Sequence, residues 1–254
     1  MQSIDINCDM GESYGQFVIG NDAAIFPYIS SCNIACGLHG GDPLTIEATI
    51  RQALQHGVRI GAHPSYPDLA GFGRRRMHLP PAELTAVVKY QIAVLKSLTE
   101  SQGGQLAYVK PHGALYNVAA DDETEARAVL RAVQEMDSAL ALMGLAGSTM
   151  ERLAAEVGCA FIAEAFADRR YTAQGRLVAR SRAGAVLETP ALAAAQVLRL
   201  VQQQQVESNE GTPVAVRAQS ICIHGDNPAA VAMLQAIQQT LADHDIRREA
   251  VAAC

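Results

Sequence analysis

Short apolar segments alternate with amphipathic helical patterns along the whole chain. Seven segments have the length and composition of β-strands, at residues 3–7, 29–35, 59–62, 106–109, 139–143, 159–163 and 220–223. Between them, apolar residues recur at helical spacing, as in the run of Val231, Leu234, Ile237 and Leu241. Near-continuous apolar strands that alternate with helices are typical of a parallel sheet covered by helices. The pattern therefore predicts an α/β fold.

Capping residues mark the expected ends of several helices. Three helices are expected to begin at an N-cap residue followed by proline, at Asp42-Pro43, Thr189-Pro190 and Asn227-Pro228. Ser148 and Glu151 form a capping box, and Gly158 ends the same helix. Only residues 202–211 resemble a variable loop, and no linker or fixed-period repeat divides the chain. We predict a single domain over residues 1–254 and favour a (β/α) barrel of the TIM type over an open sheet.

The first predicted strand separates polar from apolar side chains. Alternate residues point to opposite sides of a strand. One side carries Asp5, Asn7 and Asp9, and the other carries Ile4, Ile6 and Cys8. In a barrel the outward side chains pack under helices and the inward ones fill the interior. We expect the polar set inside, where burying carboxylates is costly unless they are paired, hydrogen-bonded or part of a site.

Polar residues also gather where the predicted strands end. Four of the seven histidines follow such ends: His39, His63, His112 and His224. The other three lie in or beside helical patterns and are expected at the surface: His56, His78 and His244. The carboxyl ends of parallel strands open onto one side of an α/β fold, and sites are built there. The sequence therefore predicts one shared active site.

The candidate residues divide by the chemistry of their side chains. Carboxylates and imidazoles serve general acid–base catalysis, and the candidate catalytic residues are Asp9, Glu12, His39, His63, Lys110, His112, Asp168 and His224. Candidates for binding a substrate or a phosphate are Asn7, Asn33, Gly40, Gly41, Lys110, Arg169, Arg170 and Asp226. Among these, Lys110, Arg169 and Arg170 are the cations best placed to hold a carboxylate or a phosphate. Their individual roles stay open.

A bound metal also stays open. The first strand has the acids of a calcium loop, but Met10 and Gln16 occupy the positions where an EF-hand needs glycine and an acid. A transition metal held by Asp9 with two of the histidines, such as His63 and His112, is compatible with the residue types, because carboxylate and imidazole suit zinc, manganese or iron. No zinc-type spacing fixes the ligands.

A glycine-rich turn, residues 37–41, leads into the helix expected to start at Pro43. Backbone N–H groups and the helix dipole make such a turn able to bind an anion. The turn lacks the Gly-Lys-Ser/Thr ending of a P-loop, and Asp42 would repel phosphate unless a cation lay between them. A phosphate cradle and a glycine-lined gap for the substrate are both possible. Cys36 continues an apolar strand, so we expect a buried thiol rather than a nucleophile.

Composition narrows the classes of function. Of the 254 residues 49% are hydrophobic and 18% charged, which argues against disorder. The net charge of -6 argues against a nucleic-acid surface.

The only dense cationic run, residues 71–76, is either a solvated loop or an anion-binding loop. No signal peptide or membrane span is expected, because acids interrupt the first ten residues and no apolar stretch reaches about 18 residues. Six scattered cysteines without a Cys-x-x-Cys motif indicate reduced thiols in a cytoplasmic protein.

Seven motifs together resemble those of the LamB/YcsF family, whose bacterial members are subunits of ATP-dependent 5-oxoprolinases. They are DINCDMGESYG (5–15), SCNIACGLHGGDP (31–43), GAHPSYPDLAGFGRR (61–75), VKPHGALYN (109–117), EAFADRRY (164–171), SRAGAV (181–186) and IHGDNP (223–228). The resemblance implies a deformed (β/α) barrel of seven strands. It also implies the opening of the lactam 5-oxo-L-proline to L-glutamate, with Mg-bound ATP as co-substrate and with two further subunits, B and C.

The resemblance gives the candidate residues a chemical context. ATP would phosphorylate the lactam carbonyl oxygen, and water would then open the ring. Lys110 and Arg169 would hold the phosphate or the substrate carboxylate, and the four strand-end histidines would polarise the substrate or donate protons. Asp9 or Glu12 would act as general base. No tightly bound organic cofactor is implied.

Two hypotheses of other classes also fit the residues. The first is a metal-dependent amidohydrolase or deacetylase-like hydrolase that acts without ATP, which the inward acids and the histidines would serve equally well. The second is a non-catalytic scaffold that only supports partner subunits. A homo-oligomer is compatible with each of them.

Overall fold

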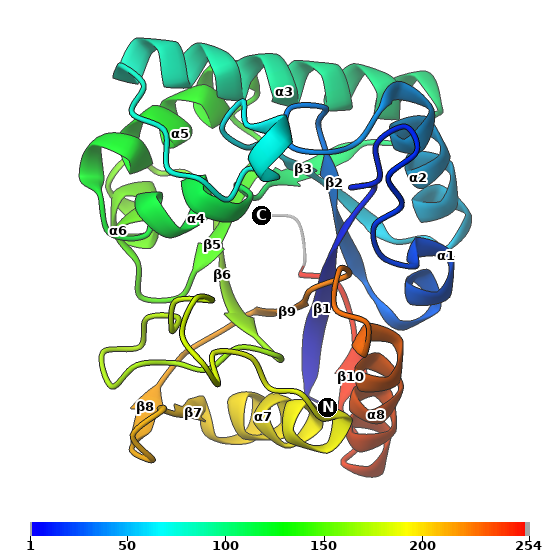
Figure 1. Cartoon of the computed structure of the whole chain (residues 1–254), viewed down its shortest axis with the longest axis vertical. Helices are drawn as coiled ribbons and strands as arrows, with labels where there is room; N and C mark the ends of the chain where they lie inside the picture. The colour runs from blue at the N-terminus through cyan, green and yellow to red at the C-terminus, as the bar shows by residue number, and fades with distance from the viewer. Residues whose placement is uncertain (1, 252–254) are drawn as a thin grey trace.

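Seven parallel strands close into a barrel in the order β1–β2–β3–β4–β5–β6–β9 and back to β1 (Figure 1). The computed structural model describes residues 2–251; the ends of the predicted domain, including Cys254, lie outside them. The barrel strands are β1 (Ser3–Met10), β2 (Ser31–Ala35), β3 (Arg59–His63), β4 (Leu106–Val109), β5 (Ala141–Leu145), β6 (Phe161–Phe166) and β9 (Ser220–Ile223). β9 pairs with both β6 and β1, which closes the sheet. The predicted seven-stranded barrel is confirmed.

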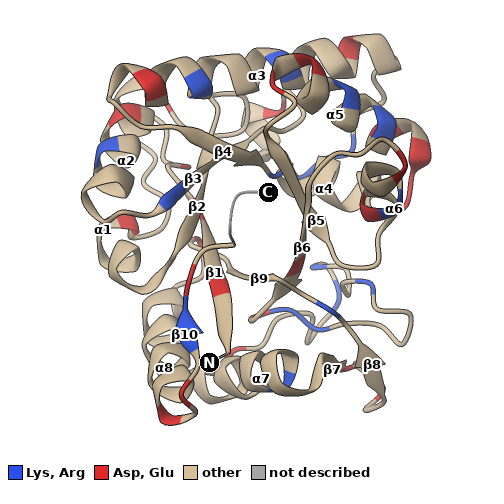
Figure 2. Cartoon of the chain, turned by 180° about the vertical axis from the view of Figure 1, so that it is seen from behind, with Lys and Arg blue, Asp and Glu red and all other residues tan. Residues whose placement is uncertain are grey.

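Helices surround the barrel. They are α1 (Asp22–Ile25), α2 (Pro43–Gln55), α3 (Pro81–Ser101), α4 (Gly113–Ala119), α5 (Glu123–Met136), α6 (Thr149–Glu156), α7 (Pro190–Gln203) and α8 (Ala230–Asp243), with 3-10 turns at Phe26–Tyr28 and Leu69–Gly71. Figure 2 shows charged residues mainly on these helices and loops, whereas the barrel strands carry few. No helix of the described residues is both long and apolar enough to cross a bilayer.

Three short strands lie outside the barrel. β7 (Gln205–Glu207) and β8 (Pro213–Ala215) form an antiparallel pair, and β10 (Arg247–Arg248) runs parallel to the start of β1. The prediction of a variable loop at residues 202–211 is therefore wrong in part. Val206 is buried, and its strand β7 pairs with β8. The buried side chain and the hydrogen bonds between the two strands hold this part of residues 202–211 in place.

The capping signals place most of the helix starts correctly. Asp42 accepts hydrogen bonds from the backbone N–H groups of Leu44 and Thr45, and Ser148 accepts one from Glu151. Thr189 caps α7 in the same way. The predicted start at Asn227-Pro228 is wrong by two residues, because α8 begins at Ala230. Asn227 instead accepts from the N–H of Ala229, which forms a turn ahead of the helix.

The two faces of β1 have the predicted environments. Ile4, Ile6 and Cys8 belong to the large apolar core of the protein, whose other members include buried helix residues. Asp5 lies on the other face and accepts hydrogen bonds from the hydroxyl groups of Ser31 and Ser220, from the strands on either side of β1. The inward position of the polar set is therefore confirmed.

The barrel interior is apolar on one side only. A small separate cluster is formed by Tyr108, Ala141, Met143 and Ile162, from β4, β5 and β6. The hydroxyl of Tyr108 lies 2.8 Å from Oδ1 of Asn33, so the ring reaches across to β2. Gly61 of β3 makes room for it, because a Cβ there would lie 2.2 Å from the ring. Buried polar side chains from β1, β2, β6 and β9 occupy the rest of the interior.

Candidate active site

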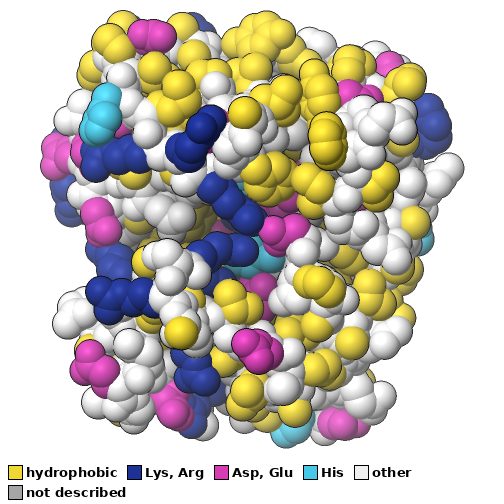
Figure 3. All heavy atoms as spheres, in the orientation of Figure 1, with side chains coloured by type: hydrophobic (Ala, Val, Ile, Leu, Met, Phe, Trp, Pro, Cys, Tyr) yellow, Lys and Arg dark blue, Asp and Glu magenta, His cyan; other side chains and the backbone are white. Residues whose placement is uncertain are grey.

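A cavity of about 450 Å³ opens among the loops that follow the barrel strands. Figure 3 shows a hollow in this face, with histidine and acidic side chains inside it and Lys or Arg side chains beside it. Eight predicted site residues line the cavity: Asp9, Glu12, His63, Lys110, His112, Arg169, His224 and Asp226. Four more are buried behind its wall: Asn7, Asn33, His39 and Asp168. Gly40, Gly41 and Arg170 do not line it. The segments predicted to meet at one site do meet.

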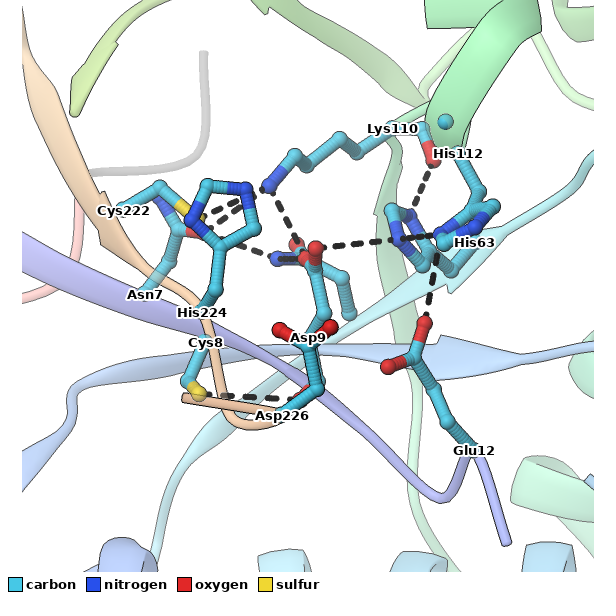
Figure 4. A network of polar contacts seen from close by, with 12 residues as sticks. Asn7, Cys8, Asp9, Glu12, His63, Lys110, His112, Cys222, His224 and Asp226 are labelled. Carbon is cyan, nitrogen blue, oxygen red and sulfur yellow. Dashed lines mark hydrogen bonds and ion pairs between the residues drawn. The ribbon is translucent and has the colours of Figure 1, made fainter. Parts of the chain in front are cut away.

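Lys110 joins two carboxylates inside the barrel. Its Nζ lies 2.9 Å from Oδ1 of Asp9 and 3.2 Å from Sγ of Cys222 (Figure 4). It also lies 2.9 Å from Oε1 of Glu164. The side chain is only 2% exposed. Burial alone would lower the pKa of Lys110, but the negative charge of Asp9 and other neighbours raises it well above the ordinary value. Lys110 is therefore charged, and its charge is already matched by protein carboxylates.

Asp9 is the carboxylate that connects Lys110 to the histidines. Its Oδ1 also accepts from Asn33 (2.8 Å), and its Oδ2 lies 3.3 Å from Nε2 of His63. Burial would raise the pKa of Asp9, but the charges of His63 and Lys110 outweigh it and hold the pKa well below the ordinary value. A carboxylate of such low pKa is a weak proton acceptor at neutral pH. The geometry suits Asp9 better for orienting Lys110 and His63 than for taking a proton.

Asn7 and Asn33 form the hydrogen-bonded layer beneath these charges. Asn7 donates to Glu164 (2.9 Å) and to Ser220 (2.8 Å). Asn33 donates to Oδ1 of Asn7 (2.7 Å) as well as to Asp9. Both amides are fully buried, and neither lines the cavity. They hold the carboxylates in place from below, which differs from the direct substrate contact that was predicted for them.

Glu12 and three histidines form a second buried group. One potential ligand atom from each of Glu12, His39, His63 and His112 lies within 4.8 Å of the others. Oε1 of Glu12 is 3.2 Å from Nε2 of His39 and 3.2 Å from Nδ1 of His112. Burial, and then the charge of His112, lowers the pKa of His39 to about 3, so this imidazole is neutral at pH 7 and keeps a free lone pair. Carboxylate and neutral imidazole are ligands for transition metals.

Backbone carbonyl groups fix the proton positions on two of these imidazoles. Nδ1 of His63 lies 2.7 Å from the carbonyl oxygen of Lys110, and Nε2 of His112 lies 2.9 Å from that of Phe72. Carbonyl oxygens only accept, so both nitrogens carry protons. The remaining nitrogens, Nε2 of His63 and Nδ1 of His112, face each other at 3.0 Å. Two lone pairs at this distance repel unless a proton or a cation lies between them.

This arrangement fits a divalent transition metal. Histidines that bind metals commonly donate their other N–H to a carbonyl, as His63 and His112 do here. The metal ligands considered from the sequence were Asp9, His63 and His112. The structure groups the two histidines with Glu12 and His39 instead, while Asp9 contacts the edge of the group through His63.

The glycines of the β2–α2 turn make room for the backbone that carries Glu12. A Cβ on Gly40 would lie 2.5 Å from the carbonyl oxygen of Glu12, and one on Gly41 would lie 2.9 Å from that of Gly11. Gly11 itself has a φ of +67°, and its N–H donates to Asp22 (2.7 Å). The two loops therefore pack backbone against backbone, and this contact fixes the position of Glu12.

His224 and Asp168 form a separate pair at the cavity wall. Nδ1 of His224 lies 2.9 and 3.0 Å from the two carboxylate oxygens of Asp168, and Phe166 stacks on the imidazole at 5.3 Å. Burial would raise the pKa of Asp168, but the charge and hydrogen bond of His224 lower it overall. An ionised carboxylate only accepts, so Nδ1 carries the proton and Nε2 is left for the cavity.

The cationic run at residues 71–76 is divided between the cavity and the surface. Arg74 lines the cavity and forms an ion pair with Asp226. The side chain of Arg75 is 68% exposed and pairs with Asp68, so it does not reach the cavity. One residue of the run thus contributes to the site, and another is a solvated surface pair.

Several residues of the site escaped the sequence reasoning. Glu164 is a lone acid in the apolar run of β6, and that isolation was a usable signal. Tyr116 lines the cavity, and in the sequence only its place in the 109–117 motif distinguishes it. Arg176 and Arg180 come from an irregular segment after β6. No periodic pattern in the sequence indicates which side chains of such a segment turn inward.

A parallel (β/α) barrel with buried acids, imidazoles and cations around one cavity is an architecture in which active sites are built. Comparison with known proteins identifies the family. The model of the LamB/YcsF family matches residues 4–254, and the chain belongs to this family.

Similar proteins cover nearly the whole chain. It is 51% identical to a 5-oxoprolinase A subunit (number 3) of Pseudomonas syringae pv. tomato over 95% of this chain and 94% of that protein. It is 52% identical to the 5-oxoprolinase A subunit of Acinetobacter baylyi over 94% of each. Among solved structures, the lactam utilization protein from Thermus thermophilus matches with a TM-score of 0.93 and 44% identity. That match covers 98% of this chain and 100% of the other.

Replacing Lys110 by Met is expected to lower the free energy of unfolding by about 3–5 kcal/mol at pH 7, because Asp9 and Glu164 lose their buried counter-charge. In the wild type the low pKa of Asp9 stabilises the fold above the carboxyl's unfolded pKa, and this contribution is lost as pH falls through the folded pKa. The loss caused by Lys110→Met should therefore shrink on acidification. Urea unfolding at pH 7 and at pH 3, which lies below the unfolded carboxyl pKa of about 3.9, measures it.

Lys89→Met is the matched control, because Lys89 pairs with Glu135 at the surface. Its cost should stay below about 1 kcal/mol at both pH values. A Lys110→Met cost as small as this, or one that does not change with pH, would contradict the buried ion pairs.

The metal-stripped chain is expected to bind one Mn²⁺ or Zn²⁺ ion per molecule and to melt at a higher temperature when the ion is present. Ion concentrations of about 100 times Kd should add about 2.7 kcal/mol of stability. His112→Ala should abolish the shift, because its Nδ1 faces Glu12 and His63. Elemental analysis after dialysis and thermal unfolding measure both effects.

His78→Ala is the control for that experiment, because His78 is exposed and lies outside the group. It should bind the ion like the wild type. Equal binding by His112→Ala, or none by the wild type, would show that Glu12 and the three histidines are not a metal site.

Proposed function

We propose that this chain is the A subunit of a cytoplasmic 5-oxoprolinase, a hydrolase that opens the cyclic amide of 5-oxo-L-proline to give L-glutamate. In this proposal the reaction consumes Mg-bound ATP, releases ADP and phosphate, and requires two partner subunits, B and C. The names of relatives about 50% identical over nearly the full length support it. The observation that carries it is the meeting of the Lys110 ion pairs, the Asp168–His224 pair and the Glu12–histidine group at one cavity.

The chemistry explains why ATP is needed. A lactam amide is a poor electrophile, because the ring nitrogen donates electron density into the carbonyl group. Transfer of the γ-phosphoryl group of ATP to the carbonyl oxygen makes the ring carbon more electrophilic. Water then adds to that carbon, the ring C–N bond breaks, and the nitrogen leaves with a proton as the amine of glutamate. A second hydrolysis releases the phosphate.

His224 is assigned to take a proton from the attacking water at Nε2 and to give it to the leaving nitrogen. Asp168 holds its Nδ1–H, so Nε2 is the nitrogen that can exchange a proton with a substrate in the cavity. Lys110 supplies positive charge near the carbonyl oxygen, and the ionised carboxylate of Asp9 holds Lys110 and lies beside His63. A divalent cation held by Glu12, His39, His63 and His112 would add Lewis acidity to the same oxygen.

One observation favours a second candidate function. The Glu12–histidine group would also serve a metal-dependent amide hydrolase that needs no ATP. The two functions differ in their requirement for ATP and for partner subunits, and both can be measured in one assay.

The assay measures L-glutamate released from 5-oxo-L-proline by the chain alone and with the B and C partners, each with and without ATP. We expect release only with ATP and the partners. His224→Gln should lower kcat by about 10²–10⁴-fold, because it removes the proton donor. His78→Gln, an exposed residue outside the cavity, is the control.

Release by the chain alone, without ATP and abolished by EDTA, would establish the second function instead. Normal turnover by His224→Gln with all subunits present would contradict its role as proton donor. No release under any condition, with the control active in folding and assembly tests, would contradict both functions.

A further inference from the structure

The segment that follows β6 places unmatched positive charge on one wall of the cavity. Five arginines lie in this segment: Arg169, Arg170, Arg176, Arg180 and Arg182. Arg176 forms an ion pair with Asp121, whereas the other four have no carboxylate within 4.0 Å in the described part of the chain. The chain as a whole carries a net charge of -6. Local positive charge on an acidic protein indicates an anionic ligand at this wall.

Arg169 is the innermost of these cations. Its side chain lines the cavity while the residue is only 5% exposed. One terminal NH₂ group donates to the carbonyl oxygen of Val178 (2.6 Å), but Nε has no hydrogen-bond partner among the described residues. A buried donor without an acceptor is costly, and a buried charge without a counter-charge more so. Nε of Arg169 is therefore open to an acceptor that a bound anion would supply.

Arg180 increases this deficit. It is exposed and lines the same cavity as Arg169. Burial, and then the positive charge of Arg180, lowers the pKa of Arg169 to about 10, which still leaves the guanidinium charged at pH 7. Two like charges therefore lie near each other at the cavity wall. The nearby Asp168 favours the charged form of Arg169, but it is paired with His224 and lies more than 4.0 Å from both guanidinium groups.

The other cations near the cavity cannot take this role. Lys110 is matched by Asp9 and Glu164, and Arg74 is paired with Asp226. Arg170, predicted from the sequence as an anion-binding residue, lies outside the cavity lining. Arg169 and Arg180 are the cavity-lining cations left without a carboxylate among the described residues.

We propose that Arg169 and Arg180 bind the carboxylate group of the lactam substrate and thereby select an acidic lactam over a neutral one. The identity of the substrate rests on the proposed function. A guanidinium group matches the two oxygens of a carboxylate in one plane, which an ammonium group cannot do. In 5-oxoproline the carboxylate and the reacting carbonyl are attached on the two sides of the ring nitrogen. One anchor on the carboxylate therefore sets where the carbonyl points.

The test compares 5-oxo-L-proline with 2-pyrrolidinone, which has the same ring amide but no carboxylate. Calorimetric titration of the chain assembled with its B and C partners should show at least about tenfold tighter binding of 5-oxo-L-proline, as expected for charge-assisted hydrogen bonds. Arg180→Met and Arg169→Lys should each weaken the binding of 5-oxo-L-proline by about tenfold or more. Neither should change the binding of 2-pyrrolidinone. Arg180 is exposed, so its variant keeps the test valid if the buried Arg169 variant misfolds.

Arg182→Met is the matched control, because Arg182 is exposed in the same segment and does not line the cavity. It should bind both lactams like the wild type. If the wild type binds 5-oxo-L-proline and the Arg180 and Arg169 variants bind it equally well, the carboxylate anchor is overturned while the proposed function stands.

If the wild type binds neither lactam, the proposed function fails. Titration with acetate and with inorganic phosphate then tests separately whether Arg169 and Arg180 form a carboxylate-binding site. Acetate binding that Arg180→Met weakens and Arg182→Met does not would support a carboxylate site. Absence of acetate binding, tighter binding of phosphate than of acetate, or equal acetate binding by all variants would overturn it.

Discussion

The ammonium group of Lys110 lies inside the barrel within 2.9 Å of carboxylate oxygens from two different strands. Asp9 comes from β1 and Glu164 from β6, which are separated in the closed sheet by β9. Without the lysine, two negative charges would be buried in the same interior, and at least one of them would have to take up a proton. The polar side of this barrel depends on that neutralisation.

The remaining site geometry follows from it. Because Asp9 stays ionised, it can accept from Asn33 and lie beside Nε2 of His63 at the same time. The backbone carbonyl of Lys110 accepts from Nδ1 of His63, so the residue that carries the central charge also fixes the orientation of the imidazole beside it. The fold supports this arrangement by confining apolar side chains to the opposite side of the interior, around Tyr108.

The positions of the elements and the meeting of the strand ends could be predicted from the sequence. Alternation along β1 separated Asp5, Asn7 and Asp9 from the core residues, because side-chain direction in a strand has a period of two. Histidines beside glycine or proline at strand ends marked the cavity, because parallel strands share one open end. These signals are local, so a single sequence contains them.

Roles that depend on contacts between distant segments could not be predicted. Gly40 and Gly41 resembled a phosphate loop, yet they pack against the backbone of Gly11 and Glu12, which are far from them in the sequence. In the sequence, Lys110 has the features of a cation that is free to bind a ligand, whereas in the structure it is paired with Glu164 of a distant strand. Arg180 belongs to an irregular segment, where no periodicity indicates the direction of a side chain.

The chain has only three lysines, Lys89, Lys96 and Lys110, so the protonation of Lys110 can be followed directly by NMR of labelled lysine side chains. The signal of Lys110 should remain that of a charged ammonium group through and above pH 10.4, where a free lysine is half deprotonated, for as long as the protein stays folded. A Lys110 that loses its proton below that pH in the folded protein would contradict the interaction on which this account of the site depends.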